Sequence, residues 1–464
     1  MVLEKLPTEL LLHIGEFLTA KDTAVLRQVS RNVSAKVSDQ GPFASGLRSK
    51  TRSVEFSPHS LQLLVEMTRP GRLGTALESL ILVGVPLGRR EAVTHPTTIT
   101  TADAVLHGAG GQGDDDRAMM TALLAEAMRN LKANGEHRGL PSLSLTVDGS
   151  AVEDVRREWV CIWAAASQMF HVTLDALRHS DDLPIGALDL FTRPYCCSLS
   201  VANFWRDDLD DLLLRQCAPT ICSVRRLHLS ISRERNLFRE RVWTVGQTAL
   251  SVPIEPWAPR EAGFARFLAA FRSVDDFKIH RYMIYHPDGQ RQSAERDWFP
   301  QARARGALGN LARCSLRGLR VKGGDLLAFV QASPGLREVD MHGVTLDPTQ
   351  DAEPAVGFRQ VFDWLTVRAG SQLRELRLED LQEKNRRVVF YHEPDDEVDD
   401  SHGWGRFRLT RRGETSARRP VPFGPVEEEI NFEAYRLSIA RDGLLYGHPR
   451  NRMVDGVKPA KDYY

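Results

Sequence analysis

The stretch LLAFVQASPGLREVDMHGVTL, residues 326–346, places a helix signal, a break and a strand signal in direct succession. Its first part is apolar, and the SPG segment at 333–335 combines residues that end helices and form turns. Apolar and charged residues then alternate in LREVDM (336–341), which is typical of a strand with one buried face. The stretch therefore predicts a helix that turns back into a short strand.

Three apolar residues with the same spacing recur along the chain. The copies begin at Leu77, Leu140, Cys196, Val224, Val274, Leu316, Leu336 and Leu373. Several of them follow a helical stretch that ends in Pro or Gly, as in LQLLVEMTRPGRLGTALESLIL (61–82) and VFDWLTVRAGSQLRELRL (361–378). Repeated units of helix, break and strand indicate an α/β protein.

Two copies extend further, as LESLILVGVPL (77–87) and LREVDMHGVTL (336–346), and in this form they resemble the leucine-rich repeat. The resemblance implies an irregular leucine-rich-repeat-like α/β solenoid with a curved, mostly parallel sheet over residues 46–410. The copies lie about 20 to 63 residues apart, against a period of about 20 to 29 in the family, so long insertions or drifted repeats are expected. An ordinary α/β domain is the alternative.

The segment LPTELLLHIGEFLTAKDTAVLRQVSR (6–31) reads as two short amphipathic helices. Glu9, His13 and Glu16 interrupt its apolar run at helical intervals, which excludes a secretory signal because that needs a continuous apolar core. Two helices in about 40 residues cannot bury enough surface to stand alone. They must therefore pack against the rest of the chain or against another protein.

The order of LP, ELL, FL, Asp22 and VSR in this segment closely resembles the F-box of fungal-type F-box proteins. The resemblance implies a three-helix F-box over residues 1–45 that docks onto the Skp-type adaptor of SCF-type ubiquitin ligases. The adaptor-binding positions carried over from the family are Leu6, Pro7, Leu10, Leu11, Ile14, Leu18, Leu26 and Val29.

An F-box followed by repeats implies a substrate-recognition subunit of an SCF-type E3 ubiquitin ligase. Such a subunit presents a protein target to a cullin-RING ligase through the adaptor and is not itself an enzyme. Residues 411–464 would then form a C-terminal cap or tail, and the protein would be intracellular, in the cytoplasm, the nucleus or both. The alternatives are an F-box interaction protein outside any ligase and an enzyme in a divergent α/β domain.

Residues beside the apolar positions of each predicted strand should point to the concave side of the sheet and bind the target. They are Arg226, His228, Arg320, Lys322, Glu338, Asp340, His342, Glu375, Arg377 and Glu379. Two interpretations stay open. The charges of Arg320 and Lys322 could pair with Glu338 and Asp340 on a neighbouring strand, or the face could recognise a charged or phosphorylated target.

Composition and motifs argue against other classes of function. The 464 residues carry 61 basic and 61 acidic side chains, so a basic excess typical of nucleic-acid or membrane-surface binding is missing. The chain has six cysteines without a CxxC pair and no P-loop, HExxH or GxSxG motif, so no metal or cofactor is expected. The GAGGQG segment (108–113) is followed by three aspartates, which would repel a pyrophosphate.

Overall fold

The computed structural model describes Leu6, most of the chain between residues 51 and 425, and two residues beyond it. The described residues are 6, 51–71, 77–85, 112–135, 137–148, 155–192, 197–204, 212–232, 258–284, 298–347, 356–368, 371–383, 386–392, 396, 407–425 and 445–446. The predicted F-box, apart from Leu6, lies outside them. Leu6 itself is half-buried in a bend.

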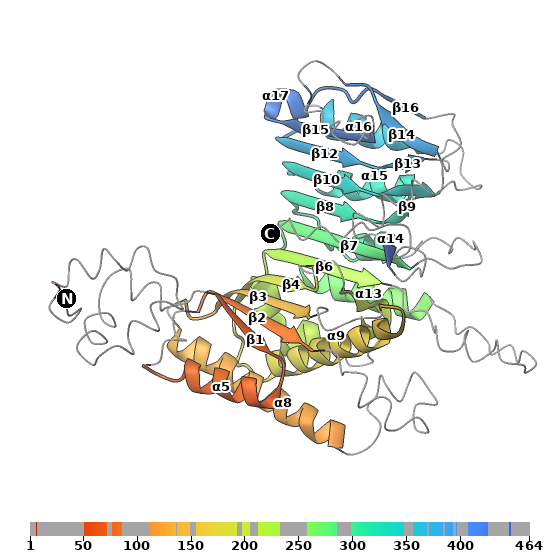
Figure 1. The fold of residues 1–464 in the computed structure, drawn as a ribbon. Helices are drawn as coiled ribbons and strands as arrows, with labels where there is room; N and C mark the ends of the chain where they lie inside the picture. The colour runs from red at the N-terminus through yellow and green to blue at the C-terminus, as the bar shows by residue number, and fades with distance from the viewer. Residues whose placement is uncertain are drawn as a thin grey trace, which may run out of the picture.

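The protein is a mixed α/β structure built on one large, mostly parallel sheet, which confirms the predicted class (Figure 1). Along the main path of this sheet the strands lie in the order in which they occur in the chain. They are β1 (Thr51–Glu55), β2 (Ser79–Gly84), β3 (Leu140–Val147), β4 (Ile185–Leu190), β6 (Arg226–Ser232), β7 (Asp276–Ile284), β8 (Arg313–Arg317), β10 (Glu338–His342), β12 (Glu375–Glu379) and β15 (Arg408–Arg412).

Neighbouring strands on this path are parallel except β12 and β15, which are antiparallel. Two short strands join the sheet beside the path: β5 (Leu199–Ser200) pairs with β6, and β17 (Leu445–Tyr446) pairs with β7. In Figure 1 the strands form a ladder in which β1 and β2 are rotated relative to the upper rungs, as the twist of a sheet requires. The ladder gives the molecule its elongated form.

Apolar side chains line up across the strands. Leu80 lies opposite Leu143, and Leu143 lies opposite Leu188 on the next strand. The same row continues through the centre of the sheet, where Leu227 lies opposite Phe277. Because side chains alternate between the two faces of a strand, one face of the sheet becomes continuously apolar and the other carries the polar residues.

The helices cover the apolar face, where their buried side chains join those of the strands in one core (Figure 1). The contacts between helices also follow chain order, with α5 against α8 and α8 against α9. The α-helices are α5 (Pro58–Thr68), α8 (Gln112–Asn134), α9 (Val155–Arg178), α11 (Ala218–Ser223), α13 (Ala258–Ala270), α14 (Trp298–Ala304), α15 (Gly323–Ala332), α16 (Phe358–Thr366) and α17 (Glu414–Ala417), and shorter helical turns are η3 (Val201–Phe204) and η4 (Leu212–Gln216).

Aromatic rings connect successive helices in this core. Phe170 of α9 contacts Phe204 of η3 with ring centroids 5.3 Å apart, and Phe204 contacts Phe267 of α13 at 4.7 Å. Further along, Phe299 of α14 contacts Phe329 of α15 at 4.6 Å. Such ring pairs add about 0.5–1.5 kcal/mol each beyond the area they bury, so they hold the helical layer together along its length.

A second, five-stranded sheet lies at the ends of the upper strands. It contains β9 (Arg320–Lys322), β11 (Thr345–Asp347), β13 (Gln382–Glu383), β14 (Arg386–Phe390) and β16 (Phe423–Pro425). A corner residue with positive φ joins each upper strand to this sheet: Gly318 at 67°, Gly343 at 62° and Asp380 at 51°. The amide of Gly318 donates to the carbonyl of His342 at 2.9 Å. The chain therefore changes direction with a left-handed backbone residue after each of β8, β10 and β12.

Six of the eight apolar copies found in the sequence place their strand residues in the large sheet, in β2, β3, β6, β7, β10 and β12. The copy that begins at Cys196 yields only the two-residue β5. The copy that begins at Leu316 starts at the end of β8 and continues into β9 of the second sheet. The boundary expected between residues 410 and 411 falls inside β15, which pairs with β12.

A buried ion pair closes the upper end of the ladder. The Arg411 guanidinium on β15 donates to both carboxylate oxygens of Asp396, at 2.8 and 3.3 Å, and both side chains are fully buried. The same guanidinium donates to the carbonyls of Arg419 and Pro420. This pair thus joins Asp396, which belongs to the acidic segment PDDEVDD (394–400), to the arginine-rich segment RFRLTRRGETSARR (406–419).

Candidate functional site

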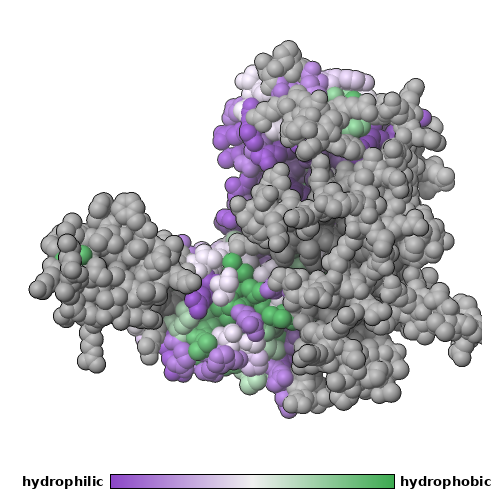
Figure 2. All heavy atoms as spheres, viewed as in Figure 1, coloured by the Kyte–Doolittle hydropathy of each residue, from purple (hydrophilic) through white to green (hydrophobic). Residues whose placement is uncertain are grey.

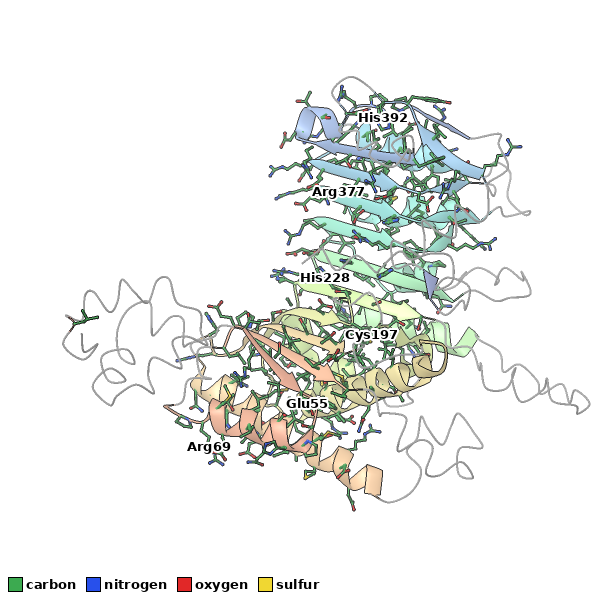
Figure 3. All side chains as sticks on the ribbon, in the orientation of Figure 1. Glu55, Arg69, Cys197, His228, Arg377 and His392 are labelled. Carbon is green, nitrogen blue, oxygen red and sulfur yellow. The ribbon has the colours of Figure 1, made fainter. Side chains whose placement is uncertain are left out.

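The polar face is the side of the large sheet opposite the helices, from β4 to β12. Its members are Asp189, Arg226, His228, Asp276, Lys278, His280, Arg313, Ser315, Arg317, Glu338, Asp340, His342, Glu375, Arg377 and Glu379. Figure 2 shows hydrophilic surface over the upper strands, and Figure 3 labels His228 and Arg377, which belong to the same row of side chains. Parallel pairing of neighbouring strands aligns these side chains in one row, which runs from Asp189 on β4 to Arg377 on β12.

Asp276 at the start of β7 is the centre of one charged cluster. Its carboxylate lies 3.2 Å from Nε2 of His228, 3.0 Å from Nη2 of Arg313 and 3.7 Å from Nε of Arg226. Burial alone would raise the pKa of Asp276, but the hydrogen bond from His228 and the charges of His228, Arg313 and Arg226 outweigh it and lower the pKa. Asp276 therefore stays ionised and fixes three side chains from two neighbouring strands.

Asp340 on β10 forms a second cluster with β8. Arg317 donates to its carboxylate at 2.8 Å and Ser315 donates at 2.9 Å. Burial opposes ionisation of Asp340, but the charge and hydrogen bond of Arg317, the bond from Ser315 and the charge of His342 together lower its pKa. Asp340 therefore forms its ion pair with Arg317 of the neighbouring strand, and not with Arg320 or Lys322, which were the partners considered from the sequence.

Glutamates anchor the upper end of the polar face. Glu375 accepts a hydrogen bond from Nε of Arg377 at 2.7 Å and lies 3.5 Å from Nε of Arg412. Glu379 pairs with Arg408 on β15 and lies 4.0 Å from Nδ1 of His342. Most of these pairs are half-exposed, so each contributes little stability. Their main effect is to fix the direction of each charged group.

Lys278 differs from the other cations of the polar face. No residue that the structure describes accepts a hydrogen bond from its ammonium or lies within ion-pair distance of it. Burial lowers the pKa of Lys278 and the charge of Arg317 lowers it further, whereas the charges of Asp189, Asp340 and Asp276 act in the opposite direction. The lysine thus presents a partly desolvated cation to the face.

His280, the next polar-face residue on β7, is buried. Burial lowers its pKa to about 3, and the charges of Arg317, Lys278 and His342 act in the same direction. Its ring is therefore neutral at physiological pH. The positive charge at this point of the face comes from Lys278 and the arginines.

Two cavities open on the polar face. The first has a volume of about 390 Å³ and reaches from β3 to β8 over Ser144, Asp189 and Lys278. The second, of about 450 Å³, continues from β6 to β12. Both are lined by Arg226, His228, Lys278 and Arg317, so they are adjacent and form one polar depression along the sheet.

The structure brings together eight of the ten residues predicted to bind a target. Arg226, His228, Glu338, Asp340, His342, Glu375, Arg377 and Glu379 all lie on the polar face. Arg320 and Lys322 do not, because they belong to β9 in the second sheet, where they lie opposite Thr345 and Asp347. Their expected place beside Glu338 is taken by Arg313. The recognised copy begins at Leu316, near the end of β8, whereas the strand itself contains the overlapping copy formed by Leu311, Cys314 and Leu316.

Residues at the centre of the depression were not predicted. Lys278, Asp276 and His280 lie in VDDFKIH (274–280), a segment whose apolar pattern was recognised. The rule applied to the other strands would have selected Asp276 and Lys278 here. Asp189 lies on β4, whose sequence IGALDL has the same spacing of apolar residues, at Ile185, Leu188 and Leu190, but was not among the recognised copies.

The predicted adaptor-binding residues are not brought into the site by the described structure. Pro7, Leu10, Leu11, Ile14, Leu18, Leu26 and Val29 lie outside the described residues, and Leu6 is the one member within them. The F-box prediction therefore stays a prediction. The GAGGQG segment also lies outside the described residues, except Gln112 and Gly113 at the start of α8.

Two thiols of the described structure are held in the protonated form by burial. The Cys314 thiol is buried near Asp340 and Asp276, and burial first of all raises its pKa, so it is a poor nucleophile. Burial likewise raises the pKa of Cys217 to about 12.

Within the described ranges, no group of three or more His, Cys, Asp or Glu residues is placed to hold a metal ion. No described helix is long and apolar enough to cross a membrane.

Comparisons with known proteins add no relatives to this description. No protein-family model matches the chain. No curated protein matches it with significant similarity.

Proposed function

We propose that the chain is a substrate-recognition subunit of an SCF-type ubiquitin ligase. In this proposal the N-terminal segment docks a Skp-type adaptor, and the polar face binds a protein target in a leucine-rich-repeat-like solenoid. The observation that carries the proposal is the polar face itself: rows of charged and polar side chains, most of them held by ion pairs or hydrogen bonds, on one side of a sheet whose other side is covered by helices.

The order of the elements supports a repeat architecture. Along the main path of the large sheet each strand pairs with the one that precedes it on that path. The units β8–β9–α15 and β10–β11–α16 have the same sequence of strand, corner, short strand and helix. In solenoids each unit contacts its neighbours, and stacking creates one long binding surface. Strands that pair in chain order, and helices that contact one another in chain order, support this interpretation.

The sequence of residues 6–31 supports the docking role. Its combination of LP, ELL, FL and VSR resembles the F-box closely, and the amphipathic helices predicted for it would need a packing partner. A receptor of this kind acts by positioning its bound target. It raises the local concentration of target lysines near a conjugating enzyme and requires no catalytic side chain of its own.

Charged clusters on the polar face favour a selective partner. A complementary partner must match Asp276, Asp340 and their cations in position, and a mismatch leaves desolvated charges unpaired. Because the clusters are already fixed by ion pairs, little further ordering is needed when a partner binds.

The docking role can be tested by affinity purification of the tagged full-length protein. We expect the wild-type chain to retain a Skp-type adaptor together with a cullin. A Leu10→Asp/Ile14→Asp variant should lose both, because it places two charges on the apolar side of the first predicted helix. The matched control His13→Ala changes the opposite side and should retain both.

Two results would contradict the proposal. One is a wild-type protein that captures no adaptor. The other is capture of adaptor without cullin, with unchanged half-lives of all co-purifying partners, which would instead favour an interaction protein outside any ligase.

A further inference from the structure

Lys278 lines the cavity of about 390 Å³ near the centre of the polar face. Parallel pairing places it directly opposite His228 on β6, which is labelled in Figure 3, and Ser315 on β8. The diagonal positions on these two strands, about 7–8 Å away, hold Arg226, Ser230, Arg313 and Arg317. None of these neighbouring positions holds a carboxylate, so the side chains beside Lys278 on β6 and β8 are cationic or neutral.

The carboxylates that act on Lys278 from further away are held by other groups. Asp276, two residues earlier on β7, is held by two arginines and a histidine of the neighbouring strands. Asp340 on β10 accepts hydrogen bonds from two side chains of β8. Asp189 on β4 accepts hydrogen bonds from the backbone amide and the hydroxyl of Thr192, at 3.0 and 2.7 Å. Of the residues that the structure describes, none accepts a hydrogen bond from Lys278 or forms an ion pair with it.

These surroundings shift Lys278 towards its neutral form. Burial lowers its pKa most and the charge of Arg317 lowers it further, against the opposing charges of the three aspartates. His280, the next polar-face residue on β7, adds no charge at physiological pH, because burial lowers its pKa to about 3. Each unit by which the pKa of a lysine falls raises the fraction of neutral amine about tenfold. A desolvated lysine beside another cation is activated as a nucleophile in this way.

We propose that the ε-amine of Lys278 reacts reversibly with carbon dioxide in this cavity and forms a carbamate. The amine nitrogen attacks the carbon atom, an N–C bond forms, and the electron pair of one C=O π bond moves onto oxygen. The nitrogen then gives its proton to solvent, so each carbon dioxide molecule yields a carbamate anion and a proton. The reaction needs no oxidant, reductant or further reactant. The inference goes beyond the proposed function and does not depend on it.

The cavity favours a carbamate over other adducts of an amine. Carbamate formation replaces a positive charge by a negative one at a position whose diagonal neighbours are mostly arginines. Arg226 lines the same cavity, is 54% exposed and lies 3.7 Å from Asp276, so it retains N–H donors for the new anion. An imine formed with an aldehyde would be a cation when protonated, and the arginines would disfavour it. The cavity is many times larger than the volume of a water molecule, about 30 Å³, which leaves room for carbon dioxide.

Isotope labelling of the full-length protein tests the inference. The protein is equilibrated near neutral pH with bicarbonate and carbon dioxide that carry carbon-13, and the carbamate is trapped by ethylation with an oxonium salt. Peptide mass spectrometry then measures the labelled fraction of each lysine. We expect the labelled fraction of Lys278 to exceed that of Lys322 at least about tenfold, because Lys322 lies on β9 in the second sheet, outside the cavity.

Substitutions show whether the signal belongs to this site. Lys278→Arg keeps a positive charge but removes the amine, so one carbamate resonance should disappear from the carbon-13 NMR spectrum of the labelled protein. Arg226→Gln should lower the labelled fraction of Lys278 several-fold, because it removes a charged donor to the anion. Arg412→Gln is the matched control, since Arg412 lies on β15 away from the cavity and its loss should leave the labelled fraction unchanged. Urea unfolding of each variant shows that it is folded.

A pH series and an aldehyde arm complete the test. The labelled fraction of Lys278 should fall as pH decreases, because protonation removes the attacking amine, and its curve should lie at lower pH than that of free acetyl-lysine amide. Equal labelling of Lys278 and Lys322, or an unchanged carbon-13 spectrum of Lys278→Arg, would overturn the inference. Labelling of Lys278 by formaldehyde and borohydride without labelling by carbon dioxide would also overturn it, since the lysine would then react with a different class of electrophile.

Discussion

Lys278 holds an ammonium group in a partly buried position where no described carboxylate lies within ion-pair distance. Its lowered pKa means that the folded protein disfavours the charged form. Asp340 and Asp276 nearby are instead satisfied by arginines, histidine and serine. A residue that costs stability in the middle of a well-paired surface is expected at a binding site.

We therefore expect Lys278→Met to stabilise the protein by about 0.5–2 kcal/mol, the range of single stabilising substitutions. Because the folded-state pKa of Lys278 lies below its unfolded value, the cost is full at neutral pH if the lysine is charged and declines as pH rises between the two pKa values. Urea unfolding at neutral and alkaline pH would measure both effects.

The control for this substitution is Arg317→Met on the next strand. It should destabilise the protein by about 1–3 kcal/mol, because it leaves the half-buried Asp340 carboxylate without its arginine. If Lys278→Met were as destabilising as Arg317→Met, the lysine would have a structural partner and the idea of an uncompensated charge would fail.

His280 makes stability depend on pH. Its folded-state pKa is about 3 and its unfolded value is about 6.5, so the unfolded chain binds more protons between these values and stability falls as pH decreases through the window. From about pH 7.5 to about pH 5 this single group should cost about 2 kcal/mol. Asp276 and Asp340, whose pKa values are lowered, add to the loss at still lower pH.

A His280→Gln variant should lose about 2 kcal/mol less than the wild type over the same range. Chemical unfolding at the two pH values measures the difference. His179→Gln, which makes the same substitution at an exposed position just after α9, provides the control for the exchange of residue type. Parallel pH profiles for wild type and His280→Gln would contradict the assignment.

At the scale of elements, the corners between strands repeat more regularly than the sequence suggests. Gly318, Gly343 and Asp380 follow β8, β10 and β12 directly, and all three have positive φ. In the left-handed region an L-residue costs about 1–2 kcal/mol, and glycine avoids that cost. The corners direct the chain from the large sheet into the second sheet.

Gly343→Val should destabilise the protein by about 1–2 kcal/mol, because a β-branched residue is poorly accommodated at φ 62°. The matched control is Gly324→Ala in the first turn of α15, where an added Cβ meets open space. That change should be neutral or stabilising by up to about 1 kcal/mol. Denaturant midpoints of the two variants give the comparison, and equal stability of Gly343→Val and wild type would show that the corner tolerates side chains.

The spacing of three apolar residues identifies six strands of the large sheet, among them β2, β10 and β12. It did not single out β4 or β8, although Ile185, Leu188 and Leu190, and likewise Leu311, Cys314 and Leu316, have the same spacing. Because this spacing recurs often by chance, the pattern alone does not select the true strands. The second sheet is also missed, because its strands are only two to five residues long. Strands of this length are specified by their neighbours and carry little periodic signal.

The sequence likewise predicts only part of the candidate site. Eight face residues follow from the alternation of side chains along β6, β10 and β12, which one strand can reveal. The depression around Lys278 depends on which strands are neighbours and on how their rows align. That information lies in the pairing of β3 to β8, and no single segment contains it.

For the whole molecule, the upper end of the ladder is closed by β15 and by the buried pair of Arg411 and Asp396. An antiparallel final strand and a buried charge pair protect the sheet from further pairing at that end. Removing one partner of such a pair leaves an uncompensated buried charge and typically costs about 3–5 kcal/mol.

We expect Arg411→Met to destabilise the protein by about 3 kcal/mol or more, with amide protons of β12 and β15 exchanging faster than those of β2 and β3. Hydrogen exchange read by mass spectrometry would locate the loss. Arg412→Met on the same strand is the control, because Arg412 is 56% exposed and its pair with Glu375 should be worth less than about 1 kcal/mol. A uniform increase in exchange over the whole chain would contradict a local capping role.

The order of the strands in the large sheet has a kinetic consequence. Because β1 pairs with β2, β2 with β3 and so on to β12, each strand finds its partner among residues already made by the ribosome. Each pairing can therefore form once its second strand has been made, without waiting for the rest of the chain. β15 follows the same order, but it runs antiparallel and seals the exposed side of β12. Completion of the native sheet thus waits for the last strand of the ladder to leave the ribosome.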